Sequence, residues 1–115
     1  MVMIKKLYII SVLLLFSVSA VAIEYYVAPN GGSGSGAKDD PWSLSYANAQ
    51  LMPGDKAILR GGTYTNDKFA PARSGTSESK RIIYEAYPGE TPKFRPTSKI
   101  TTLIVVANKS YITVD

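Results

Sequence analysis

The stretch that decides the fold is LMPGDKAILRGGTY, residues 51–64. A Pro-Gly pair, which cannot continue a helix, stands directly before an alternating strand in which Ala57 and Leu59 share one face. The Gly-Gly pair at 61–62 permits a corner where a side chain or a positive φ would be a problem. Asp55 is expected to tie the turn through its carboxylate. The segment therefore predicts a helix end, a tight turn, a half-buried strand and a sharp corner in quick succession.

Upstream of this turn, the sequence predicts a short amphipathic helix from Pro41 to Leu51, with Asp40 as the residue that caps it. Leu44, Ala47 and Leu51 recur at helical spacing and share one face. A helix this short is stable only when it covers apolar surface.

The segments before this helix have a different character. Residues 24–28 (EYYVA) predict a short strand, because they are aromatic or β-branched and are followed by a Pro-Asn-Gly turn. The glycine-rich run at 31–36 (GGSGSG) predicts a flexible loop. Its spacing does not match that of a phosphate-binding loop.

Downstream of the corner, short strands alternate with turns. Extended segments are expected at 63–65, 81–87, 93–95, 102–107 and 111–114, with a loop at 66–80 and a turn at 108–110. The strands recur at similar intervals, from Leu59 to Tyr84 and from Tyr84 to Val105. Loosely repeated short strands are typical of stacked coils, each of which buries its face only against its neighbours. A β-sandwich remains the rival interpretation, although hairpin turns between adjacent strands are lacking.

The segment 51–64 resembles the opening "PGD-x-V-x-L-x-G-G-T-Y" of the right-handed parallel β-helix proteins of the pectate-lyase-like superfamily. Further matches to the family pattern lie at 25–31, 41–47, 81–90 and 111–115, so the resemblance covers residues 24–115. It implies an all-β, right-handed parallel β-helix (a solenoid) whose first coil is closed by a short N-terminal capping helix. Chondroitinase-B and alginate lyases and the calcium-dependent pectate lyases are similar in this respect.

What the resemblance implies about activity is a polysaccharide lyase that cleaves uronic-acid glycans by β-elimination. In the family, the cationic cleft lies on coils downstream of the region matched here. Residues 23–115 are therefore expected to be the N-terminal cap and first coils of a longer protein, inactive alone, with no catalytic residue and no metal ligand of their own. Ca²⁺ is a cofactor of the full-length parent in this interpretation, and an acidic polysaccharide is its partner. The alternative is a non-catalytic extracellular β-helix that binds carbohydrate or acts as an adhesin.

The segment 1–22 has the layout of a secretory signal peptide. Lys5 and Lys6 precede an apolar run from residue 7, and Ala20-Val21-Ala22 has the small-x-small pattern of a cleavage site. The apolar segment 7–22 is shorter than the ~20 residues that a membrane-spanning helix needs. We therefore expect cleavage after Ala22, a secreted product (extracellular or periplasmic), and no membrane association after cleavage.

Composition excludes several classes of site. The chain of 115 residues has no cysteine and no histidine. Disulfides, zinc sites built on these residues and catalytic triads that require either one are therefore excluded. Residues 23–115 carry 11 basic and 9 acidic residues, a formal charge of +2. This charge is too small to indicate nucleic acid or a membrane surface as a partner.

Three groups of side chains are candidates for function, each with a more ordinary structural explanation. Exposed Lys and Arg are usually solvated, and that is the favoured interpretation of the cations Arg60, Arg73, Lys80 and Arg81. Two adjacent carboxylates without further oxygen ligands are weak evidence for calcium, and these are Asp39 and Asp40. Aromatic rings that stack on sugars more often pack on one another, and the candidates are Tyr25, Tyr26, Trp42 and Tyr46. No substrate-binding residue is assigned from the sequence.

Overall fold

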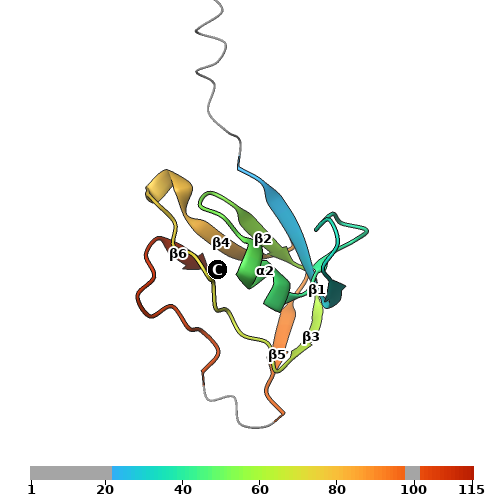
Figure 1. Cartoon of the computed structure of the whole chain (residues 1–115). Helices are drawn as coiled ribbons and strands as arrows, with labels where there is room; N and C mark the ends of the chain where they lie inside the picture. Colours follow the sequence, from blue (N-terminus) through green and yellow to red (C-terminus); the bar gives the residue numbers. More distant parts are fainter. Residues whose placement is uncertain (1–21, 98–101) are drawn as a thin grey trace, which may run out of the picture.

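The computed structural model describes residues 22–97 and 102–115 (Figure 1). The predicted signal peptide falls on residues 1–21, outside this part. The fold is mostly β-strand with little helix, in the order β1 (Glu24–Gly32), α2 (Leu44–Gln50), β2 (Lys56–Leu59), β3 (Gly62–Thr65), the 3-10 helix η1 (Glu78–Lys80), β4 (Ile82–Ala86), β5 (Pro92–Arg95) and β6 (Ile112–Val114). Within these residues, no helix is both long and apolar enough to cross a membrane.

The strands form two parallel sheets, one of four strands in the order β1-β2-β4-β6 and one of two strands, β3-β5. Val27 of β1 pairs with Leu59 of β2, and Leu59 pairs in turn with Ala86 of β4. Tyr84 of β4 then pairs with Val114 of β6, so the repeat expected from Tyr84 to Val105 is wrong. Parallel pairing of consecutive repeats in this way is consistent with a β-helix.

The third side of the molecule consists of α2 and two irregular segments that run beside one another. Ala72 N donates to Asn48 O of α2 at 2.9 Å, and Phe69 N donates to Leu103 O at 2.8 Å. Val105 N in turn donates to Phe69 O at 2.8 Å. In the first repeat, α2 therefore occupies the place that residues 68–75 occupy in the second.

The predicted strand at 102–107 is wrong. This segment forms only an isolated bridge, in which Ile104 is the parallel partner of Phe69. The side chains from Leu103 to Val106 are 36 to 44% exposed. A β-branched run forms a regular strand when its side chains pack against cross-strand and same-face neighbours, and these side chains have little of such packing.

The helix begins later than predicted. Its N-cap is Ser43, whose hydroxyl accepts from Tyr46 N at 3.1 Å, and not Asp40. Trp42 is extended and forms bridges with Val27 and Gly32 of β1, so residues 41–43 are not available to the helix. The predicted apolar face is confirmed, because Leu44, Ala47 and Leu51 are fully buried.

The glycine-rich run at 31–36 is not the flexible loop that its composition predicts. Gly32 N donates to Pro41 O at 2.9 Å, and Tyr26 N donates to Gly36 O at 2.8 Å. The indole Nε1 of Trp42 donates to Gly34 O at 2.8 Å. A run of glycines permits this close approach of backbone to backbone, and the hydrogen bonds hold it in one conformation.

The turn before β2 forms as predicted. The carboxylate of Asp55, which is only 6% exposed, accepts from Met52 N at 2.9 Å. Gly54 and Gly62 have φ of 91° and 122°, values that residues with side chains rarely adopt.

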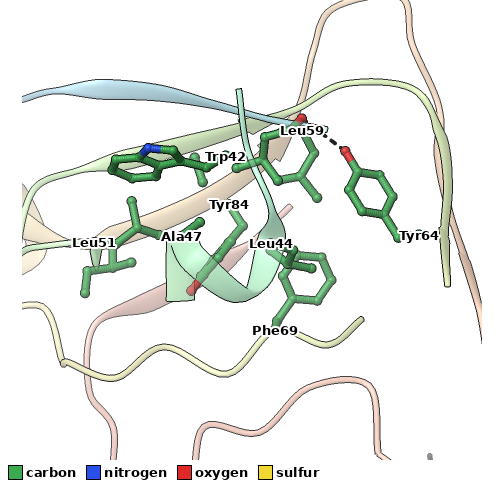
Figure 2. Packing of buried hydrophobic residues seen from close by; sticks show 11 residues of the cluster. Trp42, Leu44, Ala47, Leu51, Leu59, Tyr64, Phe69 and Tyr84 are labelled. Atoms are coloured by element: carbon green, nitrogen blue, oxygen red, sulfur yellow. Dashed lines mark hydrogen bonds between the residues drawn. The ribbon is translucent and has the colours of Figure 1, made fainter. Parts of the chain in front are cut away.

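The core lies between the two sheets and the third side (Figure 2). Its polar atoms are paired: Tyr64 Oη donates to the backbone oxygen of Val27 or Arg60, at 3.1 and 2.7 Å, and Tyr84 Oη donates to Asn48 Oδ1 at 2.8 Å. Burial raises the pKa of both phenols above the usual value. The core residues are Val27, Trp42, Leu44, Ala47, Leu51, Ala57, Leu59, Tyr64, Phe69, Ile82 and Tyr84.

Candidate functional site

The four candidate cations do not form one cluster. Arg73 Nη1 donates to Ala49 O at 2.6 Å, at the end of α2, and Arg81 bonds Thr113 Oγ1 at 2.8 Å and the carboxylate of Glu78. Lys80 lines a different pocket, near Pro53 and Asp55. Arg60 lies on the outer side of the four-stranded sheet, described below.

The two candidate calcium ligands are accounted for only in part. Asp40 accepts from the backbone N of Ser35 at 2.9 Å and faces its hydroxyl at 3.2 Å, so its carboxylate closes the glycine-rich loop. Among residues 22–97 and 102–115, no three His, Cys, Asp or Glu side chains come together in a way that could hold a metal ion.

The four candidate aromatic residues separate into two places. The rings of Tyr25 and Trp42 stack at 4.1 Å with an interplanar angle of 17°, and Tyr46 meets Trp42 edge-on at 5.2 Å. These three rings pack on one another at the first repeat, the ordinary role for such residues. Tyr26 points to the opposite side of β1, because side chains alternate along a strand.

Tyr26 belongs to a group of side chains that we call the outer-face cluster, made of Tyr26, Lys38, Arg60, Tyr87 and Glu90. Arg60 directly follows β2 and Tyr87 directly follows β4. Tyr87 N donates to Leu59 O at 2.8 Å, which places these two strand ends side by side. Lys38 reaches the cluster from the loop that the glycine-rich run forms.

The geometry of the cluster is tight. Arg60 donates to Glu90 twice, from Nε to Oε1 at 2.8 Å and from Nη2 to Oε2 at 2.9 Å, and Gly61 N donates to Glu90 Oε1 at 2.8 Å. The Arg60 guanidinium carbon lies 4.3 Å from the centre of the Tyr87 ring. Lys38 Nζ donates to Tyr87 Oη at 2.9 Å. The Tyr26 ring is 6.2 Å from that of Tyr87, tilted by 48°.

These contacts shift the acidity of the cluster. The hydrogen bonds from Arg60 and Gly61 lower the pKa of Glu90 to about 2. The hydrogen bond from Lys38 lowers the pKa of the Tyr87 phenol. With two cations and one carboxylate, the cluster carries a net charge of +1 at neutral pH. It therefore favours an anionic ligand.

The sequence identified only Tyr26 and Arg60 of this cluster as candidates. Tyr87 and Glu90 stand within the segment 81–90 that matches the family pattern, but neither was singled out. Lys38 carried no signal, because 49 residues separate it from the phenol that it contacts.

A second feature is an apolar cavity of about 220 Å³ at the β6 end of the core. Its walls come from both sheets and the third side, and Tyr84, Phe69 and Phe94 contribute rings to it. Ala86, predicted to share the buried face of Ile82 and Tyr84, lines this cavity and is exposed. The cavity has no polar group arranged for chemistry.

Comparison with known proteins agrees with this architecture. No protein-family model matches the chain. The fold is that of a pectate-lyase-like parallel β structure, and the function that goes with it at the family level is carbohydrate-related.

Two particular proteins carry that statement. Pectate lyase L of Thermoclostridium stercorarium is 38% identical over 71 residues, which are 58% of this chain and 6% of that protein. The solved structure titled "The complex structure of XylC with xylose" matches with a TM-score of 0.54 and 35% identity, over 60% of this chain and 11% of the other. The chain thus spans a small part of the length of each.

Proposed function

We propose that this chain forms the first coils of a secreted right-handed parallel β-helix, in a protein that degrades polysaccharides. The observation that carries the proposal is the parallel register of the four-stranded sheet, in which each strand pairs with that of the next repeat, together with the 38% identity to Pectate lyase L. In this proposal α2 closes the first coil of the solenoid. The signal peptide at 1–22 directs export, to the extracellular space or the periplasm.

The reaction proposed for the whole protein is β-elimination of a uronic-acid glycan. That chemistry requires neutralisation of the carboxylate next to the acidic C5 proton, and a base that removes the proton. Neutralisation comes from Arg and Lys or from a Ca²⁺ ion, as a divalent cation stabilises such developing charge. We assign no catalytic residue and no metal ligand to this chain, and we place the cleft on further coils.

The apolar cavity beside β6 supports this placement. Leu59, Tyr84 and Phe94 face it from strands of both sheets, and Val114 of β6 forms part of its rim. Apolar walls and an unpaired strand edge of this kind favour another coil stacked on β6.

The partner that we propose is an acidic polysaccharide, and neither nucleic acid nor a membrane. The net positive outer-face cluster supports an anionic partner. A second candidate is a non-catalytic protein that binds carbohydrate or acts as an adhesin. The XylC structure, whose title reports a complex with the neutral sugar xylose, favours this second candidate.

Affinity electrophoresis of the full chain through gels that contain pectate, xylan or no polysaccharide tests the proposal. We expect pectate to retard the chain, without formation of the unsaturated product that β-elimination creates and ultraviolet absorbance detects. Retardation by xylan alone would support the second candidate. Equal mobility in all three gels would overturn both.

A further inference from the structure

The outer-face cluster supports a more specific assignment, which rests on the proposed function. We propose that Lys38 and Tyr87 together form a seat for one carboxylate group of an acidic sugar. The ammonium of Lys38 and the hydroxyl of Tyr87, 2.9 Å apart, would each donate a hydrogen bond to it.

Both groups have donors to spare. An ammonium has three N–H donors, and Lys38 uses one of them on Tyr87 Oη. Because that oxygen accepts from Lys38, the phenolic proton remains to be donated, and no acceptor for it is present in the part of the chain that the structure describes. A carboxylate oxygen that bridges the two groups satisfies both, and such charge-assisted bonds are the strong ones.

Lys38 differs from the other cations near it. Lys56 is paired with Glu85 at 3.1 Å, and Arg60 is paired with Glu90 at 2.8 Å. Among the residues described, Lys38 makes no ion pair, although it is exposed and held in place by the phenol. Its charge is therefore available to a ligand without the breaking of an existing salt bridge.

The rest of the cluster holds the seat in shape. The guanidinium of Arg60 covers the Tyr87 ring at 4.3 Å, and Glu90 fixes that guanidinium through two hydrogen bonds. Glu90 is neutralised by Arg60 and by Gly61 N, so it repels an incoming carboxylate less than a free glutamate would. Tyr26, partly exposed beside Tyr87, offers a ring edge to the sugar. Preorganised groups of this kind bind at a lower entropic cost.

Binding of trigalacturonate and of its methyl ester to the full chain, measured by titration calorimetry, tests the seat. The variants are Lys38→Met, which removes the charge, and Tyr87→Phe, which removes the hydroxyl and keeps the ring beneath Arg60. The matched control is Lys93→Met, an exposed lysine on β5.

For Lys38→Met we expect trigalacturonate binding to weaken by about tenfold or more, which corresponds to roughly 1.4 kcal/mol. We expect a smaller loss for Tyr87→Phe and no loss for Lys93→Met. The methyl ester should bind the wild type no better than trigalacturonate binds Lys38→Met.

Wild-type affinity in Lys38→Met would overturn the seat, because Lys38 would then only fasten the glycine-rich loop. In that case, retention of the chain by pectate would leave the proposed function standing. If the wild type binds neither trigalacturonate nor pectate, the proposed function fails together with the seat.

Discussion

Arg60 and Glu90 are joined by two parallel hydrogen bonds, from Nε to Oε1 at 2.8 Å and from Nη2 to Oε2 at 2.9 Å. The two residues are 30 positions apart and belong to consecutive repeats. The ion pair therefore links the corner after β2 to the corner after β4, and it sets the position of the Tyr87 ring between them.

This pair predicts an acid-sensitive contribution to stability. The folded pKa of Glu90, about 2, lies below its ordinary value of 4.5. A depressed carboxyl pKa stabilises the folded state above the ordinary value, and that contribution is lost as the pH falls toward the folded value. We expect wild type to be more stable than Glu90→Gln above pH 4.5, and the difference to vanish near pH 2. Thermal melts across this range measure it.

Arg60→Met is the matched variant, because it removes the main cause of the shift. It should show the same loss of pH dependence as Glu90→Gln, and the double variant should add little to either. A stability difference between wild type and Glu90→Gln that stays constant down to pH 2 would contradict the assignment.

Gly31 and Gly32 are neighbours with opposite tolerance of a side chain. A Cβ on Gly31 would lie 2.0 Å from the backbone oxygen of Trp42, whereas a Cβ on Gly32 meets nothing within 4 Å. We expect Gly31→Ala to lower the free energy of unfolding by about 1–3 kcal/mol, because rigid backbone must move. Gly32→Ala should stay close to wild type. Urea unfolding of the two variants compares them, and equal stabilities would show that the 31–36 run is not held as described.

Asn48 connects α2 to the second repeat and to the core. Its Oδ1 accepts from Tyr84 Oη at 2.8 Å and from Ala70 N at 3.2 Å, while its Nδ2 donates to Lys68 O at 2.9 Å. Tyr84→Phe should cost about 1 kcal/mol of unfolding free energy, which is typical of one hydrogen bond. Asn48→Ala should cost more, because it leaves Tyr84 Oη without its acceptor in the core. Chemical denaturation measures both, and a costlier Tyr84→Phe would contradict this order.

Export predicts a defined new N-terminus. If the signal peptide is cleaved after Ala22, the exported protein begins at Ile23. Ala20→Lys should block cleavage, since the peptidase requires small residues at this position. Intact mass of the exported and the retained protein reads the outcome directly. A wild-type product that keeps residues 1–22 would argue for an anchor instead.

Much of the local structure was predictable. The turn at Pro53-Gly54, its tie by Asp55 and the inward face of β2 follow from short-range patterns, and the structure confirms them. The helix was found with its correct buried face but with a start at Pro41 in place of Leu44, because the bridges that Trp42 forms with β1 override the local helix signal.

The sequence by itself determined where the chain turns, which residues alternate and which face of the helix is apolar, because φ preferences and side-chain periodicity act over short distances along the chain. Only the tertiary structure decided that the glycine-rich run is ordered, that residues 102–107 form no regular strand, and that Lys38 meets Tyr87. Each of these depends on partners that come from other parts of the chain, 49 residues apart for Lys38 and Tyr87. Such partners meet only when successive repeats stack in register.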